Sequence, residues 1–197
     1  ASVRTGLAAR WADREGFSLT YLPFVARAIC IAIRDFPKIN AAVEGEQLVV
    51  YRRINLAIAV DLDFEGLVAP VIKDADLKSV RELAVAINDL TQRARTGRLE
   101  PDDFTEGTYT ISNSGSYGTM ITVPIINQPQ VAILSIDGIR KKPTVIQGAE
   151  GDSIAIRPVG ILAQSFDHRA MDGAYSAAFL RRVREVIEKT NWSEIIG

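Results

Sequence analysis

The chain has 197 residues, of which 47% are hydrophobic and 24% are charged, and its formal net charge is −1. This composition is typical of a globular protein and provides no basic excess for neutralising nucleic-acid phosphates. A single cysteine and a single histidine exclude an internal disulfide and any multi-cysteine metal site. No apolar run approaches the roughly 20 residues that cross a bilayer. We therefore predict no metal site, no nucleic-acid partner and no membrane span.

The first half of the sequence predicts three helices with strands between the second and the third. Apolar spacing predicts an amphipathic helix ended by Gly16, and SLTYLPFVARAICIAIRDFP predicts a more buried helix that stops before Pro37. The runs QLVVYRR, INLAIAVDLD and GLVAPVIKDA predict strands. The third helix begins at a capping box formed by Ser79 and Glu82, and Gly97 is its C-cap.

The second half is predicted to be rich in strands, over residues 109–112, 120–126, 131–136, 144–146 and 154–156. PVGILAQSFDH predicts a long apolar strand interrupted by Gly160, and a last helix runs from Gly173 to about Lys189. SNSGSYG and QGAEGDS predict loops. With no repeat and no linker, residues 1–197 are interpreted as one α+β domain with a mixed sheet. The helix-like start at ASVRTGLAARWADREG predicts a fragment that is truncated at its N-terminus.

The only histidine, His168, lies in the stretch SFDHRAMDGA. Histidine is the usual general base near neutral pH, although a lone histidine is more often an ordinary surface or core side chain. Its place at the end of an apolar strand, between Asp167 and Arg169, favours a functional role, since these charges could orient it and tune its pKa. Asp172 is a candidate helix N-cap, a role that can coexist with a functional one.

A second candidate site lies in TYTISNSGSYGT, where Ser112 and Asn113 end a strand and enter a glycine-bearing loop. Their side chains could donate hydrogen bonds to a developing oxyanion, but Ser, Asn and Gly also favour turns, and spacing alone favours the turn. A serine hydrolase is not indicated, because no G-x-S-x-G elbow is present. No dinucleotide fingerprint or P-loop is present either.

Taken together, these stretches resemble the dihydrolipoamide acyltransferases, the core components of 2-oxo acid dehydrogenase complexes. SFDHRAMDGA resembles the family's D-H-R-x-x-D-G signature, and four further stretches occur in the family's order. They are GTYTISNSGSYGT, TVPIINQPQVAILSIDGI, YLPFVARAICIAIRDFPKINA and INLAIAVDLDFEGLVAPVIKDADLKSV. The broader H-x-x-x-D-G pattern is shared with chloramphenicol acetyltransferase and peptide-synthetase condensation domains. The resemblance therefore implies a chloramphenicol-acetyltransferase-like fold, a mixed β-sheet flanked by helices in a trimer-forming catalytic domain.

The resemblance also implies a reaction, the transfer of an acyl group from a dihydrolipoamide thioester to coenzyme A. His168 would deprotonate the coenzyme A thiol, Ser112 would stabilise the oxyanion, and Asp172 would be an ion-paired carboxylate that holds the active-site backbone. Asp61 and Asn113 match family positions near bound coenzyme A. No metal is implied, and the lipoyl group is carried on a separate domain.

The same resemblance implies partners. His168 would face Ser112 of a neighbouring subunit in a homotrimer, and such trimers assemble into larger cores. The decarboxylase and dihydrolipoamide dehydrogenase components and the lipoyl domain would be partners, with the lipoyl and subunit-binding domains absent from this chain. We expect a cytoplasmic location, or the mitochondrial matrix in a eukaryote.

Within its motifs, the sequence departs from the family pattern at two places. Ala170-Met171 replaces a commoner aliphatic pair, and Ser135 and Asp137 stand where small residues are frequent, which could alter the channel or an assembly contact. Two alternatives stay open: an inactive assembly scaffold of the same fold, and a stand-alone acetyltransferase acting on a small molecule. The acyl group and the size of the assembly cannot be read from the sequence.

Overall fold

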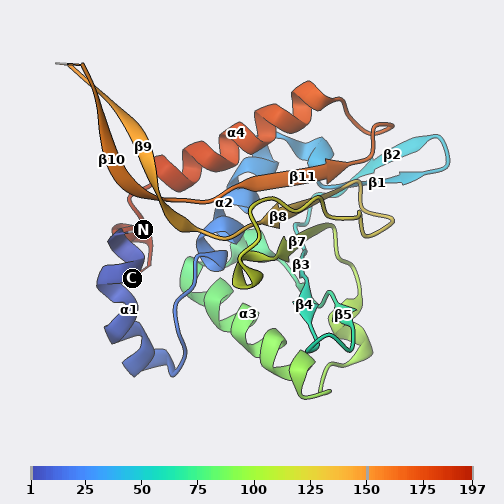
Figure 1. Cartoon of the computed structure of the whole chain (residues 1–197). Helices are drawn as coiled ribbons and strands as arrows, with labels where there is room; N and C mark the ends of the chain where they lie inside the picture. The colour runs from blue at the N-terminus through green and yellow to red at the C-terminus, as the bar shows by residue number, and fades with distance from the viewer. Residues whose placement is uncertain (1, 150, 197) are drawn as a thin grey trace.

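A five-stranded mixed sheet, in the order β11-β8-β7-β3-β6, forms the centre of the computed structural model, which describes residues 2–149 and 151–196 (Figure 1). Its strands are β3 (Leu56–Ile58), β6 (Val71–Ile72), β7 (Tyr109–Asn113), β8 (Ala132–Ile136) and β11 (Leu162–Phe166). β3, β7 and β8 run parallel to one another, and the two edge strands run antiparallel to their neighbours. The predicted α+β class with a mixed sheet is confirmed.

Helices cover one face of this sheet. The helices are α1 (Ser2–Glu15), α2 (Leu22–Asp35), α3 (Val80–Arg95), α4 (Gly173–Lys189) and α5 (Trp192–Ile195). α2 packs against both α3 and α4, and their apolar faces share one core with alternate residues of the strands, such as Ile111 and Leu134. The four predicted helices are confirmed, including the Ser79–Glu82 capping box, whereas α5 was not predicted.

Three two-stranded ribbons and short 3-10 turns complete the described chain. The ribbons are β1 (Ala41–Glu44) with β2 (Gln47–Val50), β4 (Val60–Asp61) with β5 (Leu67–Val68), and β9 (Arg140–Gly148) with β10 (Gly151–Val159). The 3-10 turns are η1 (Pro37–Ile39), η2 (Ala75–Leu77), η3 (Pro101–Phe104) and η4 (Gly115–Tyr117). The β9–β10 hairpin projects from the body on the side where both termini lie (Figure 1).

The predicted interruption at Gly160 is real, and it divides the apolar run between two different structures. β10 ends at Val159 in the hairpin, and β11 begins at Leu162 in the central sheet. A Cβ at position 160 would lie 2.8 Å from the Ile139 side chain. Glycine at position 160 therefore permits the close approach of these two segments of the chain.

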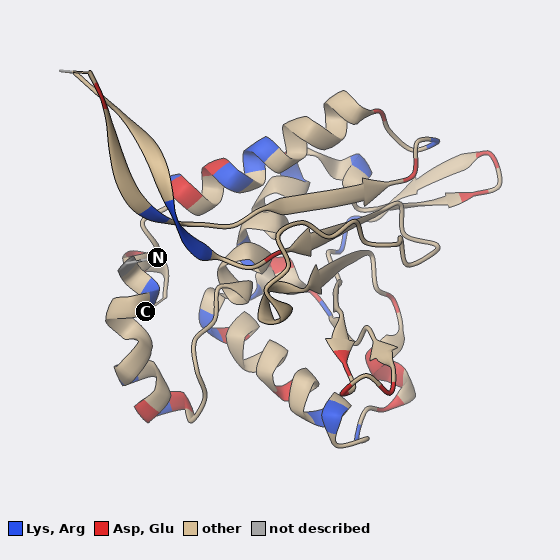
Figure 2. Cartoon of the chain, in the orientation of Figure 1, with Lys and Arg blue, Asp and Glu red and all other residues tan. Residues whose placement is uncertain are grey.

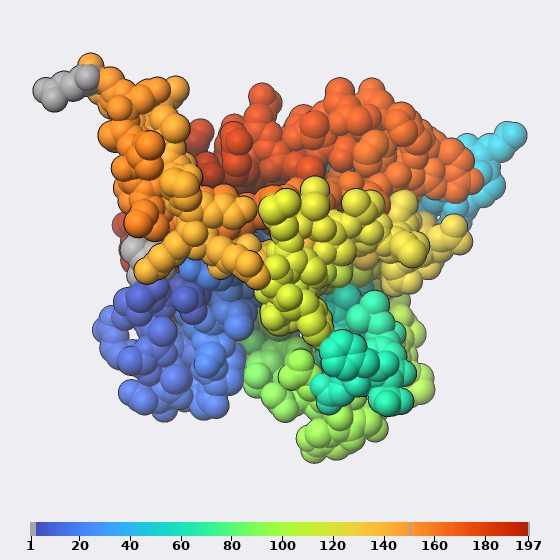
Figure 3. Space-filling model, in the orientation of Figure 1, coloured from blue at the N-terminus to red at the C-terminus, as the bar shows by residue number. Residues whose placement is uncertain are grey.

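The strand predicted over residues 120–126 is wrong. This segment pairs with no strand of the described chain and crosses the face of the sheet opposite the helices, where the Pro124 carbonyl accepts a hydrogen bond from the Ser165 hydroxyl. It leaves Met120, Val123 and Ile125 68%, 78% and 91% exposed. Figure 3 shows the segment, in yellow, on the surface of the molecule. Its apolar β-branched residues are typical of a strand, but a strand also needs a neighbouring edge with free hydrogen-bonding groups.

The charged residues are unevenly distributed along the chain. No Lys, Arg, Asp or Glu occurs between Glu106 and Asp137, so β7 and the segment that follows it are entirely uncharged (Figure 2). Among the helices of residues 2–149 and 151–196, none combines the length and hydropathy that a membrane crossing needs.

Candidate active site

Ser112 stands at the next-to-last position of β7, on the sheet face opposite the helices. Tyr109 and Ile111 of the same strand lie in the core, and side chains alternate along a strand, so Thr110 and Ser112 point to the other face. The backbone of Ser112 is paired in register with Ser135 of β8, and its side chain is half-buried. The sheet therefore fixes the Ser112 backbone while its side chain stays partly accessible.

The residues that follow Ser112 form a tight loop, Ser114–Thr122, which we call the serine loop. The Asn113 amide oxygen accepts a hydrogen bond from the Gly115 N–H at 3.3 Å, so the predicted turn is present. Tyr117 donates its hydroxyl to the Asp61 carboxylate at 2.7 Å, and this hydrogen bond raises the pKa of Tyr117. Asp61 ends β4, which continues from β3 beside β7. The structure thus brings Ser112, Asn113 and Asp61 to one end of the sheet, the serine end.

His168 lies two positions after the end of β11 and is exposed. Its ring lies beside the Phe166 ring, with centroids 5.3 Å apart. Asp167 and Arg169 pair with each other at 2.6 Å, and the Arg169 guanidinium lowers the pKa of Asp167. Within the described residues neither of these charges hydrogen-bonds the imidazole. The expectation that they orient His168 is therefore not met in the single chain.

Asp172 is the N-cap of α4, as predicted. Its carboxylate accepts the Tyr175 N–H at 2.8 Å, satisfying one of the free donors at the start of the helix. Across the described part of the chain, no Lys or Arg nitrogen lies within 4.0 Å of its carboxylate, so the ion pair implied by the resemblance stays a prediction. Asp172 and His168 together mark the opposite end of the sheet, the histidine end.

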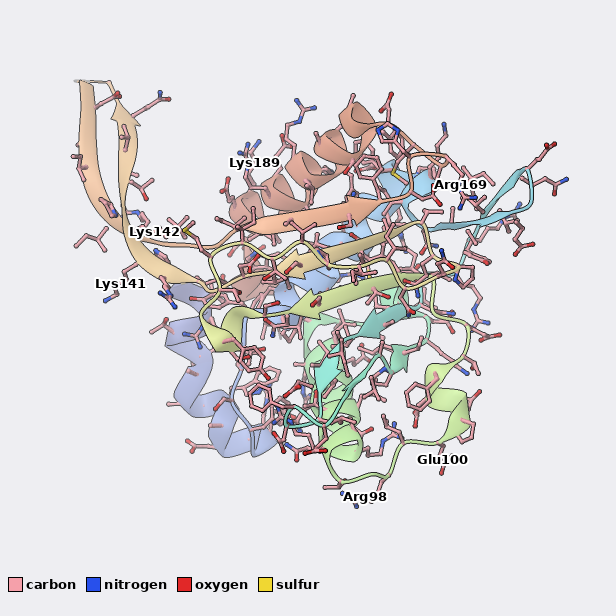
Figure 4. The ribbon with its side chains drawn as sticks, turned by 45° about the vertical axis from the view of Figure 1, so that its right-hand side comes forward. Arg98, Glu100, Lys141, Lys142, Arg169 and Lys189 are labelled. Atoms are coloured by element: carbon pink, nitrogen blue, oxygen red, sulfur yellow. The ribbon has the colours of Figure 1, made fainter. Side chains whose placement is uncertain are left out.

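The strand registers separate the two ends. Ser112 is paired with Ser135, which is paired in turn with Ala163 of β11. His168 lies five positions beyond Ala163, and at about 3.3 Å per residue this places it roughly 16 Å further along the strand direction. Figure 4 shows the same arrangement, with Arg169 beyond the arrowhead of β11 while the arrowheads of β7 and β8 point the other way. Ser112 and His168 of one chain therefore do not form a common site.

A cavity of about 610 Å³ opens at the histidine end. It is lined by residues from before β7 and β8, among them Thr108 and Gln130, and by Ala57 and Val71 from the face opposite the helices. This cavity therefore lies on the same sheet face as Ser112.

Two contributors to the serine end were not predicted as functional residues. Tyr117 donates a hydrogen bond to Asp61. Asp137 accepts three hydrogen bonds from Thr119 and Thr122, near the C-terminal end of the serine loop. Tyr117 belongs to the loop motif, and Asp137 was recognised only as a departure from the family pattern. Among residues 2–149 and 151–196, no group of three or more His, Cys, Asp or Glu side chains is arranged to hold a metal ion.

The family model for the 2-oxoacid dehydrogenases acyltransferase (catalytic domain) matches residues 1–195. The chain belongs to this family. The family prediction from the sequence motifs is therefore confirmed.

Curated relatives from three different 2-oxo acid dehydrogenase complexes resemble this acyltransferase domain about equally. The succinyltransferase component of the 2-oxoglutarate dehydrogenase complex of Bartonella vinsonii subsp. berkhoffii is 39% identical, over 95% of this chain and 45% of its own length. The acetyltransferase component of the pyruvate dehydrogenase complex of Mycobacterium bovis is 39% identical, over 99% and 36%. The lipoamide acyltransferase component of the branched-chain alpha-keto acid dehydrogenase complex of Bacillus subtilis is 38% identical, over 88% and 40%. The chain thus spans less than half the length of these relatives.

Solved structures agree with the predicted fold. A probable dihydrolipoamide acetyltransferase from Listeria monocytogenes superposes with a TM-score of 0.90 at 36% identity, covering 95% of this chain and 78% of that one. The dihydrolipoamide acetyltransferase of Azotobacter vinelandii gives 0.87 at 29% identity, covering 95% and 76%. That structure addresses the roles of a serine, a histidine and an asparagine in its catalytic mechanism, the last two four positions apart. A chloramphenicol acetyltransferase, with a TM-score of 0.51 at 13% identity, shares the fold alone.

Proposed function

We propose that this domain transfers an acyl group from the thioester of a dihydrolipoamide arm to coenzyme A, as the core of a 2-oxo acid dehydrogenase complex. The observation that carries the proposal is the set of side chains at the two ends of the sheet. Ser112, His168 and Asp172 occur in the same order as the serine, histidine and asparagine studied in the Azotobacter vinelandii enzyme, with the same spacing of four between the last two. Both Ser112 and His168 have accessible side chains.

The proposed reaction uses one base and one oxyanion donor. The His168 imidazole takes the proton of the coenzyme A thiol, because the thiolate is the nucleophile. The thiolate adds to the thioester carbonyl, and the Ser112 hydroxyl donates a hydrogen bond to the oxyanion that forms. Collapse of this intermediate breaks the bond to the dihydrolipoamide sulfur, which receives the proton from the imidazolium. The products are acyl-coenzyme A and the free dihydrolipoamide thiol.

This chemistry requires two copies of the chain. Ser112 and His168 lie at opposite ends of one sheet, so the proposed site combines the serine end of one subunit with the histidine end of its neighbour. A homotrimer, the arrangement implied by the family, provides three such sites. Asp172 caps α4 four positions after His168 and would hold the backbone there, while Asn113 and Asp61 would lie beside the coenzyme A thiol arm.

The partners follow from the same proposal. The relatives are named as components of 2-oxo acid dehydrogenase complexes, and a related solved structure is the cubic core of a pyruvate dehydrogenase complex. We therefore expect trimers of this chain to assemble further, to receive lipoyl domains and to bind the decarboxylase and dihydrolipoamide dehydrogenase components. The location follows that of such complexes, cytoplasmic or in the mitochondrial matrix.

The decisive experiment measures acyl transfer to coenzyme A from acetyl-, succinyl- and isobutyryl-dihydrolipoamide, with the wild type beside His168→Ala. We expect turnover with one acyl group and a loss of about 10²–10⁴-fold in kcat in the variant, the usual contribution of a general base. Light scattering should give the same oligomeric state for both proteins, so that the loss of turnover reports the missing base.

Two other results would replace the proposal. A folded oligomer that transfers none of the three groups would favour the inactive scaffold. Turnover of acetyl-coenzyme A with a small amine or alcohol, without turnover of any dihydrolipoamide thioester, would favour a small-molecule acetyltransferase.

A further inference from the structure

Asp137 is the first charged residue after Glu106, and it is only 1% exposed. It follows β8 directly, and because Ala132, Leu134 and Ile136 face the core, the alternation places Asp137 on the same sheet face as Ser112. Burying a carboxylate is unfavourable unless hydrogen bonds replace the lost water. The hydrogen-bond donors around the Asp137 carboxylate therefore indicate its role.

Two threonines of the serine loop satisfy Asp137. Oδ1 accepts the hydroxyls of Thr119 at 2.6 Å and Thr122 at 2.8 Å, and Oδ2 accepts the backbone N–H of Thr122 at 3.1 Å. These contacts span 15 and 18 positions of sequence, so the carboxylate connects the end of β8 to the far part of the loop. Hydrogen bonds to a carboxylate are stronger than those between neutral groups.

Backbone contacts hold the same loop against the same strand end. The Ser114 N–H donates to the Ile136 carbonyl at 3.1 Å, and the Gly138 N–H donates to the Thr119 carbonyl at 3.0 Å. A Cβ at Gly115 would lie 3.2 Å from the Asp137 carbonyl oxygen, so the loop packs closely there. Asn113 directly precedes this loop, and Tyr117, which donates its hydroxyl to Asp61, lies within it.

We propose that Asp137 is a positioning residue for coenzyme A: by clamping Thr119 and Thr122, it holds the serine loop so that Asn113 and the Tyr117–Asp61 pair stay beside Ser112. The inference rests on the proposed function, which places coenzyme A at the serine end. Asp137 is buried and acts through the loop, without touching substrate. Losing the clamp should therefore weaken the use of coenzyme A and leave the use of the acyl-dihydrolipoamide nearly unchanged.

The test compares steady-state kinetics of the complete oligomer in the wild type, Asp137→Ala and Asp137→Asn. For Asp137→Ala we expect the KM for coenzyme A to rise about tenfold, the effect of losing roughly one charge-assisted hydrogen bond. The KM for the acyl-dihydrolipoamide should stay within about twofold of the wild type. Asp137→Asn should be intermediate, because its amide oxygen can still accept the threonine hydroxyls while its NH₂ group faces the Thr122 N–H. Asp13→Ala removes an exposed carboxylate of α1 and serves as the matched control.

A second measurement does not need turnover. Hydrogen exchange at the amides of residues 115–122 should accelerate in Asp137→Asn, while exchange in β7 and β8 stays slow. An unchanged KM for coenzyme A, equal rises for both substrates, or unchanged exchange in the loop would overturn the inference. If Asp137→Ala does not fold, Asp137→Asn and Thr119→Val supply the same comparison. A wild type without transferase activity would refute the proposed function, and the exchange data would then decide whether the clamp exists.

Discussion

Ser112 occupies its position because of strand alternation and register. The alternation turns its side chain away from the helical core, and its pairing with Ser135 fixes the backbone. The neighbouring Asn113 fulfils the turn prediction made from composition, since its side chain accepts a backbone N–H within the loop. Asn113 can therefore form the turn while its neighbour Ser112 takes part in the proposed reaction.

Replacing Ser112 tests its role as an oxyanion donor. We expect Ser112→Ala to lower kcat by about 10²–10³-fold with little change in either KM, because the donor acts mainly in the transition state. Steady-state transfer assays measure the effect, and Ser18→Ala, at an exposed serine between α1 and α2, is the control. A Ser112→Ala protein with wild-type kcat would exclude the hydroxyl from the reaction.

At the scale of elements, α3 shows how local signals and longer-range contacts combine. Its N-terminus has the predicted capping box, and the hydrogen bonds from Ser79 lower the pKa of Glu82. Near its other end, the Arg93 guanidinium donates a bidentate pair of hydrogen bonds to the Asp103 carboxylate of η3, with N···O distances of 2.6 and 2.8 Å. The Arg93 guanidinium lowers the pKa of Asp103, and this pair ties α3 to the segment that leads into β7.

This pair predicts a pH-dependent part of the stability. Because the pKa of Asp103 is lowered in the folded state, its contribution is present above the ordinary value of 3.8 and is lost as the pH falls through the lower folded value. Asp103→Asn should reduce the free energy of unfolding by about 1 kcal/mol at neutral pH, since the pair is only partly buried. The two proteins should converge in urea unfolding as the pH falls below about 4. Asp13→Asn should show no such convergence.

At the scale of the whole molecule, the decisive feature is the separation of Ser112 from His168. Ser112 lies in β7 and His168 lies just beyond β11 of the same sheet, yet the antiparallel pairing of β11 with β8 sends the chain back to the opposite end before His168. The segment 120–126, with its exposed apolar residues, lies on the sheet face opposite the helices. The cavity lined by Gln130 lies on the same face. A second subunit on this face would complete the site.

Mixing two inactive variants tests the shared site. In the proposed trimer, mixing Ser112→Ala with His168→Ala subunits should restore activity, because some sites then combine an intact serine end with an intact histidine end. The recovered rate should be a substantial fraction of the wild-type rate after the subunits are unfolded and refolded together, and absent when they are refolded apart. Failure of the co-refolded mixture to recover, with trimers present, would place the site within one chain.

The sequence by itself determined the elements with local signals and the family to which the chain belongs. Helical periodicity, the Ser79–Glu82 capping box and the turn after Ser112 depend on neighbours a few positions away, so a short window contains their cause. The motifs around His168 and Ser112 identified the family in the same way. Only the tertiary structure decided that residues 120–126 cross the sheet unpaired, that Asp167 pairs with Arg169 without holding His168, and that Asp137 clamps the serine loop. The path of residues 120–126 and the contacts of Asp137 depend on which strand edges and side chains meet over long separations in sequence, and no local pattern specifies those contacts. The Asp167–Arg169 pair joins residues two positions apart, but either charge could equally have paired with His168, and only the structure distinguishes these arrangements.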